Sequence, residues 1–179
     1  MIFRCFHTKN KKALVTAYKS YVRPLLEYCT EIWSPYKVTE IDRIEKVQRY
    51  FTRRLFERCD VRYVMYTERL RYLKLEPLEL RRIVFDLKML FKICHNIVDL
   101  VFDEFFKYAS SIGVLRGHSY KLFKPFCRLD VRKYFFACRV VETWNELSQN
   151  TVNAASLNVF YNCLENTNLT KYCKFNRNI

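Results

Sequence analysis

The chain has 179 residues, enough for one domain with a hydrophobic core or for two small units. Lys and Arg outnumber Asp and Glu by 32 to 18, and this net charge of +14 favours a polyanionic partner. Charges interrupt every apolar run well before the roughly 20 residues that a membrane span needs, and residues 1–12 lack the apolar core of a secretory leader, so the sequence predicts a nuclear or cytoplasmic protein with no membrane partner.

The eight cysteines and three histidines are dispersed along the chain, with no CxxC pair and no Cys–His pair at ligand spacing. Because a zinc site needs ligands in close pairs, we expect no metal and no cofactor. The motifs of phosphate-binding loops, zinc proteases and serine hydrolases are also missing, and His118-Ser119 is more typical of a turn than of a nucleophile pair. We expect the cysteines to be reduced and to pack as small buried hydrophobic side chains.

Glycine occurs only at Gly113 and Gly117. Few glycines mean few tight turns, so the composition predicts a mainly α protein, a helical bundle. The apolar spacing from Lys11 to Trp33 predicts a first helix, in which Pro24 removes a hydrogen bond and produces a kink near Tyr21.

A second helix is predicted from an N-cap at Thr39 to about Arg58. One side of it carries Ile41, Ile44, Val47, Gln48, Phe51 and Leu55. The polar side carries five cations with few acidic partners: Arg43, Lys46, Arg49, Arg53 and Arg54. Two interpretations of this side remain open, a solvated helix surface and a surface that contacts phosphates.

The middle of the chain predicts a short helix over Thr67–Lys74 and a longer one that begins at Pro77. The core face of the longer helix is predicted to consist of Leu80, Ile83, Val84, Leu87, Leu90, Phe91 and Cys94. Asp103–Ala109 is expected to form a further short turn of helix. The segment Ser110–Gly113 is the predicted domain boundary. It divides the chain into a helical region 1–110, a basic aromatic region 111–165, and a tail 166–179 that we expect to be frayed.

Seven cations and one acid, Asp130, occur between Gly113 and Val140. Aromatic residues are interleaved with these cations, as on surfaces that bind phosphates and stack bases. The predicted nucleic-acid contacts here are Arg116, Lys121, Lys124, Arg128, Arg132 and Lys133, with the rings of Tyr120 and Phe123; Phe126 is a further stacking candidate. Phe135, Phe136 and Trp144 are expected to be core.

The secondary structure of this block is left open by its pattern. Tyr120–Phe126 and Lys133–Val141 are compatible with a small β-hairpin, but the second segment could instead begin a helix that ends near Leu147. If the first segment is extended, Tyr120 and Phe123 point to opposite faces, so that only one ring set is core. A last helix is predicted from a Ser156 cap through Leu164.

Several stretches of the chain share one resemblance. They are KKALVTAYKSYVRPLLEYCTEIWSPY (11–36), IDRIEKVQRYFTRRL (41–55) and RGHSYKLFKPFCRLDVRKYFFACRVVETWNELS (116–148). In this order they resemble the helical segment downstream of the polymerase palm and the C-terminal tail of non-LTR retrotransposon reverse transcriptases of the jockey-like, LINE type. The resemblance covers nearly the whole chain, and it departs at Ser148, where the family often has proline.

The resemblance implies a thumb-like and post-polymerase fragment that grips template–primer or element RNA. RNA or DNA and the remainder of a reverse transcriptase are then the expected partners. A polymerase of this family needs paired aspartates for two metal ions. The six aspartates here include no adjacent pair, so we expect the chain to be non-catalytic. The alternatives are a helical protein-interaction domain with a basic docking face and a non-functional remnant of a decayed element.

Overall fold

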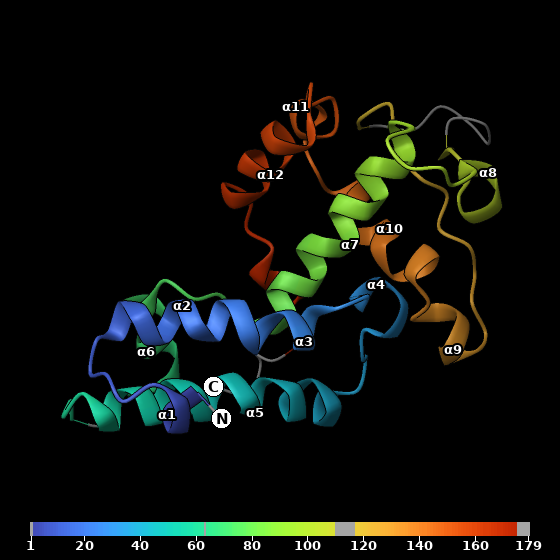
Figure 1. Ribbon diagram of the computed structural model, residues 1–179. Helices are drawn as coiled ribbons and strands as arrows, with labels where there is room; N and C mark the ends of the chain where they lie inside the picture. The colour runs from blue at the N-terminus through green and yellow to red at the C-terminus, as the bar shows by residue number, and fades with distance from the viewer. Residues whose placement is uncertain (1, 63, 110–116, 175–179) are drawn as a thin grey trace. The chain divides into compact units, whose positions relative to one another are not determined.

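The computed structural model describes residues 2–62, 64–109 and 117–174 (Figure 1). These residues form twelve α-helices and a short 3₁₀ helix. Strand pairing within them is limited to an isolated antiparallel bridge between Tyr108 and Leu122. The prediction of a mainly α protein is therefore confirmed.

The helices form two compact units. The first consists of residues 1–29 and 35–81, and the second of residues 30–34 and 82–179. The chain passes from the first to the second between Arg81 and Arg82, inside helix α7 (Leu78–Cys94). The boundary predicted at Ser110–Gly113 lies within the second unit and outside the described residues.

The first unit is built around the packing of α2 against α5 (Figure 1). Its helices are α1 (Ile2–Cys5), α2 (Lys11–Tyr21), α3 (Arg23–Glu27), α5 (Val38–Arg58) and α6 (Tyr66–Leu73), followed by the start of α7. The ring of Tyr18 on α2 stacks on Phe51 of α5 with 4.3 Å between centroids. Leu14 and Leu55 are fully buried beside this pair. These side chains belong to the apolar stripes that the sequence predicts.

The helix predicted over residues 11–33 is broken twice. The break at Tyr21 is confirmed, because α2 ends there and Pro24 lies in the first turn of α3, where its missing N–H is not needed. The second break was not predicted. Cys29 adopts a left-handed conformation, with φ of 52°, and the next helix, α4 (Thr30–Trp33), belongs to the second unit.

The second predicted helix is confirmed as α5, with two corrections. Its N-cap is Lys37 instead of Thr39, so the helix begins two residues earlier than expected. Val47, predicted on the core side, is 39% exposed, and Glu45 is fully buried in its place. Periodicity missed Glu45 because a pattern of apolar residues assigns a carboxylate to solvent.

Glu45 is buried because hydrogen bonds satisfy both of its carboxylate oxygens. Oε2 accepts the backbone N–H of Leu78, at the first turn of α7, over 2.9 Å. Oε1 accepts the hydroxyl of Tyr66 and the side-chain amide of Gln48. The Tyr18 hydroxyl donates to Gln48 Oε1 over 3.0 Å. Because burial and the nearby carboxylate raise the pKa of both tyrosines, their hydroxyls remain protonated donors. A negative charge at the N-terminus of α7 also complements the dipole of that helix.

The second unit has an aromatic core. Its helices are α4, the remainder of α7, α8 (Phe102–Phe105), α9 (Asp130–Lys133), α10 (Phe136–Asn145), α11 (Gln149–Val152) and α12 (Leu157–Glu165), with the 3₁₀ helix η2 (Thr170–Tyr172). Phe91 of α7 stacks on Phe160 of α12 with 4.4 Å between centroids, and the fully buried Trp144 of α10 lies 6.0 Å from Phe160. The predicted cap at Ser156 is confirmed, since its hydroxyl accepts the N–H of Val159.

The basic block does not form the hairpin. Most of the segment 133–141 belongs to α9 and α10, which confirms the helical alternative for it. The segment 120–126 instead makes its bridge, at Leu122, with Tyr108. A strand partner from α10 is excluded because the backbone groups of that helix are already paired within the helix.

The C-terminal tail is anchored over its described part. Leu169 and Cys173 are 3% and 2% exposed, and the Lys171 ammonium forms an ion pair with Glu146. The prediction of a frayed tail is therefore wrong for residues 166–174, because two apolar side chains reach the core. Residues 175–179 lie outside the described part.

Arg139 of α10 connects several segments of the second unit. Its guanidinium donates to both carboxylate oxygens of Asp86 on α7, over 2.8 and 2.7 Å. It also donates to the carbonyl oxygens of Thr30, Glu31 and Tyr134, over 3.2, 2.8 and 3.2 Å. Burial raises the pKa of Asp86 to about 6 although Arg139 opposes this shift, so the carboxylate is ionised at neutral pH. Arg139 therefore has a structural role, although it lies in the basic block.

We predict that Arg139→Ala lowers the free energy of unfolding by about 3–5 kcal/mol, because it leaves the buried Asp86 carboxylate without its partner. Arg128→Ala is the matched control, since Arg128 is exposed and its removal should change stability by no more than about 0.5 kcal/mol. Urea denaturation of both variants measures the difference. Equal effects of the two substitutions would show that the Arg139 contacts contribute nothing.

A second prediction concerns His118, which is 6% exposed and donates a ring N–H to the Trp144 carbonyl oxygen over 3.1 Å. Burial lowers the pKa of His118, and Lys121 lowers it further, against the backbone hydrogen bond. The folded state therefore prefers the neutral ring, and this stability is present above pH 6.5 and lost as the pH falls through the lowered pKa. His118→Gln keeps a donor but does not titrate.

We therefore expect the stability of the parent, relative to His118→Gln, to fall between about pH 7 and pH 5. Taking the difference between the two proteins cancels the opposite contribution of Asp86. Denaturation curves across this range measure it. A difference that does not change with pH would contradict the assignment.

Candidate nucleic-acid interface

The five predicted phosphate-binding cations of α5 lie on the surface of the first unit, and each is close to a carboxylate. The pairs are Arg43 with Glu40 (3.6 Å), Lys46 (3.4 Å) and Arg49 (2.8 Å) with Asp42, and Arg53 (3.6 Å) and Arg54 (3.1 Å) with Glu57. The expectation of few acidic partners needs correction, since three carboxylates serve the five cations. Exposed pairs of this kind contribute only about 0–1 kcal/mol, so phosphates can compete with the carboxylates for these cations.

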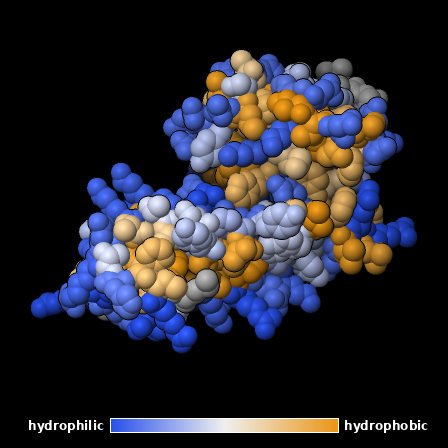
Figure 2. Space-filling view, viewed as in Figure 1, coloured by the Kyte–Doolittle hydropathy of each residue, from blue (hydrophilic) through white to orange (hydrophobic). Residues whose placement is uncertain are grey.

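An aromatic side chain on the same helix was missed by the sequence analysis. Tyr50 is 55% exposed, and its ring lies 5.7 Å from the guanidinium carbon of Arg53. The signal for it was the spacing of three residues, which places two side chains on one helix face. On the face drawn in Figure 2, the lower edge, where α5 lies in Figure 1, is hydrophilic. This face of α5 therefore combines cations with an exposed ring.

The second group of predicted contacts lies in the second unit. Lys124, Arg128, Arg132 and Lys133 are exposed, and Lys124 forms a 2.6 Å ion pair with Glu142. Lys121 is half-buried. The prediction for Arg116 falls outside the described residues. Four exposed cations thus lie within ten residues of chain, between 124 and 133.

The rings of this block differ in exposure. Phe126 is 88% exposed and Phe123 is 42% exposed. Tyr120 is half-buried, and its ring stacks on His95 with 5.2 Å between centroids. The prediction that Phe135 is core is wrong, because it precedes the first turn of α10 and remains 42% exposed. Phe126 is therefore the ring best placed to stack on a base.

Phe136 and Trp144, the other two rings predicted to be core, are 7% and 0% exposed. Both lie on the buried face of α10, and the indole N–H of Trp144 donates to the Tyr120 carbonyl oxygen over 2.8 Å. The predictions for these two rings are confirmed. Both rings are part of the core of the second unit, so they are not accessible to a ligand.

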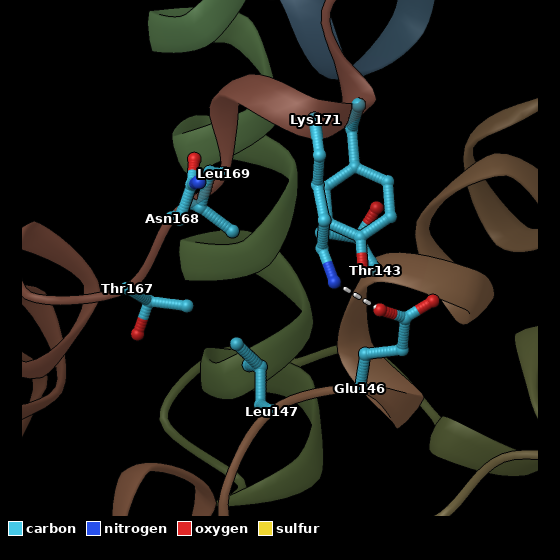
Figure 3. A pocket seen from close by; sticks show the side chains of 8 residues that line it. Thr143, Glu146, Leu147, Thr167, Asn168, Leu169 and Lys171 are labelled. Carbon is cyan, nitrogen blue, oxygen red and sulfur yellow. Dashed lines mark hydrogen bonds and ion pairs between the residues drawn. The ribbon is translucent and has the colours of Figure 1, made fainter.

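A pocket of about 290 Å³ lies between α10 and the C-terminal segment (Figure 3). Its charged groups are Glu146 and Lys171, which point toward each other and form an ion pair. The hydrogen bond from Lys171 lowers the pKa of Glu146, so the carboxylate stays ionised and the Lys171 ammonium balances its charge. The remaining six lining residues carry no charged side chain.

Within residues 2–62, 64–109 and 117–174, no group of three or more His, Cys, Asp and Glu side chains is placed to hold a metal ion. In the same ranges, no helix combines the length and the apolar composition that crossing a membrane requires.

Comparison with known proteins shows a similarity over about half of the chain. An uncharacterised protein of Caenorhabditis elegans is 29% identical over 97 residues, which are 54% of this chain. The matched segment spans 47% of the length of that protein. No family model and no solved structure matches the chain.

We predict that the triple variant Arg43→Gln, Lys46→Gln and Arg53→Gln binds duplexes more weakly, whatever their sequence. The slope of log K against log salt should flatten by up to about three units, because phosphate contacts release condensed cations. A control variant with the same charge change, Lys12→Gln, Arg62→Gln and Arg71→Gln, removes exposed cations elsewhere on the first unit. Fluorescence anisotropy over a salt series measures both, and equal slopes for the two variants would assign α5 no special role.

A further prediction is that Phe126→Ala weakens single-strand binding by roughly 1–3 kcal/mol, through the loss of base stacking. The unfolding free energy should stay within about 0.5 kcal/mol of the parent, because the ring is exposed. Tyr120→Ala is the contrasting variant and should destabilise the fold, because its ring packs on His95. If Phe126→Ala leaves the affinity unchanged, the stacking assignment is wrong.

Proposed function

We propose that the chain is a non-catalytic nucleic-acid-binding module, a thumb-like and post-polymerase part of a retrotransposon reverse transcriptase, that grips template–primer or element RNA. The single observation that carries this proposal is the exposed segment 123–133. It presents Lys124, Arg128, Arg132 and Lys133 together with the 88% exposed ring of Phe126. Cations that meet phosphates and a ring that stacks on a base are the two components of a single-strand surface.

The energetics of the segment favour a ligand. α9 buries none of its residues, so its cations contribute little to the packing of the second unit. Phe126 likewise exposes apolar surface without a packing partner of comparable area, which costs free energy in water. A bound nucleic acid would lower the free energy of both features, because its phosphates neutralise the repulsion among the cations and a base covers the exposed ring.

The cationic face of α5 fits a different part of the same role. Contacts from Arg and Lys to phosphates position a duplex without reading its sequence. The carboxylates of Glu40, Asp42 and Glu57 weaken such contacts and favour a grip that can be released and re-formed. A module of this kind is suited to holding a duplex while another part of the enzyme acts on it.

The aspartates support a non-catalytic role. Asp42, Asp60 and Asp86 are each engaged with a Lys or Arg of this chain. A two-metal polymerase centre instead needs carboxylates that converge on the metal ions. Under this proposal, the remainder of the reverse transcriptase provides the carboxylates that bind the metal ions.

The proposal is tested by measuring the binding of single-stranded RNA and of a primer–template duplex to the intact chain. We expect binding to both, with little dependence on sequence and a slope of log K against log salt of about −3 for four cations on a single strand. Primer extension with Mg²⁺ or Mn²⁺ should give no sustained nucleotide incorporation. Absence of salt-sensitive binding would overturn the binding role, and sustained incorporation would overturn the non-catalytic one.

A helical protein-interaction domain is the second candidate, favoured by exposed apolar side chains beside the same cations. Leu129 and Val131 are 72% and 83% exposed, and neither side chain offers a face for base stacking. Replacing both by Ser separates the candidates. Nucleic-acid affinity should be unchanged under the first proposal, whereas a protein partner would lose the apolar contacts on which interfaces depend.

A further inference from the structure

Two thiols of the second unit lie in contact. The sulfur of Cys127 is 3.6 Å from the sulfur of Cys138. Cys127 is half-buried in the irregular segment before α9, and Cys138 is 7% exposed in the first turn of α10. Figure 1 shows α9 next to the start of α10. Ten residues, which include the short helix α9, separate the two cysteines in sequence, and the fold brings their sulfurs into contact.

We propose that Cys127 and Cys138 are an oxidative modification site, a dithiol that closes to a disulfide on reaction with a small disulfide such as oxidised glutathione. A disulfide needs about 2.05 Å between its sulfurs, so the pair must approach by about 1.5 Å. The segment around Cys127 is free of regular secondary structure, and a small shift there breaks no helix. Cys138 can remain in place on α10.

The surroundings assign different roles to the two thiols. Cys127 is half-buried, whereas Cys138 is only 7% exposed, so Cys127 is the more accessible of the two residues. Burial raises the pKa of Cys138, and the nearby Arg132 opposes that shift. Cys127 is therefore the sulfur that meets the oxidant, and Cys138 is the resolving thiol.

The reaction balances as two thiol–disulfide exchanges. The Cys127 thiolate attacks one sulfur of oxidised glutathione, the glutathione S–S bond breaks, and one glutathione thiolate leaves. Cys138 then loses its proton to water, and its thiolate attacks the Cys127 sulfur of the mixed disulfide. The second glutathione thiolate leaves as the bond between Cys127 and Cys138 forms. Two protein thiols are oxidised and one glutathione disulfide is reduced.

Two buried thiols of the chain are less suited to this chemistry. Cys94 is buried, and burial raises its pKa to about 12, which keeps it protonated at neutral pH. Cys173 is 2% exposed in the anchored tail. An oxidant in solution therefore meets Cys127 in preference to either of them.

The disulfide would restrain residues 127–138, the stretch that carries Arg128, Arg132 and Lys133. Any effect of oxidation on nucleic-acid binding rests on the proposed function, but formation of the disulfide does not. A chain that failed to bind RNA would leave the modification site untouched, and a chain that failed to form the disulfide would leave the binding role untouched.

The test equilibrates the intact chain with graded ratios of oxidised to reduced glutathione, quenches with acid, alkylates the remaining thiols, and maps the peptides by mass spectrometry. We expect Cys127 and Cys138 to lose alkylation together and to appear as one linked peptide pair. The equilibrium constant for this link should exceed its value in urea at least about tenfold, because folding holds the two sulfurs in contact.

Two variants complete the test. Cys138→Ser should trap a glutathione adduct on Cys127, because no resolving thiol remains. Cys163→Ser removes a half-buried thiol of α12 and should leave the link intact. The proposal is overturned if Cys127 links equally well to Cys5 or Cys163, or if both thiols stay alkylatable at ratios that oxidise the exposed Cys5.

Discussion

The second unit depends on a buried ion pair between Arg139 and Asp86. The guanidinium joins α10 to α7, and it also binds the backbone carbonyls of Thr30 and Glu31, which are distant in sequence. Through these two carbonyls Arg139 links residues 30–34 to the rest of the second unit, while the chain on either side of them belongs to the first. Breaking a buried pair leaves a desolvated charge, so loss of this contact should destabilise the second unit.

Glu45 has the corresponding position in the first unit. Its carboxylate binds the first backbone N–H of α7 and the hydroxyl of Tyr66 on α6, while α5 carries it between them. In each unit a charged side chain with several hydrogen bonds therefore joins helices to one another. The Arg139 guanidinium binds the carboxylate of Asp86, and the Glu45 carboxylate accepts hydrogen bonds from the first N–H of α7 and from the Tyr66 hydroxyl.

Helix positions were predictable because apolar spacing and local breakers act over a few residues. Pro24 and Ser156 act in the structure as the sequence predicts. The core face was less predictable, since Leu25 follows the spacing of α2 but lies beyond the end of that helix at Tyr21 and is 78% exposed. The buried Glu45 and the role of Arg139 depend on contacts between residues far apart in sequence, which local patterns do not contain.

The charge pattern of the candidate site illustrates the same limit. Counting cations treats Arg139 and Arg132 alike, but one is held by Asp86 and the other lies on a helix that buries no residue. On α5 the surrounding carboxylates reduce the positive potential, whereas residues 124–133 oppose their four cations with Asp130 inside the segment and Glu142 beside it. Local potential falls with each nearby opposite charge. Five cations with three carboxylates on α5, and four cations with two carboxylates around the segment, both leave a net charge of +2. The segment is distinguished by the 88% exposed ring of Phe126, which can add base stacking to the phosphate contacts that both surfaces offer.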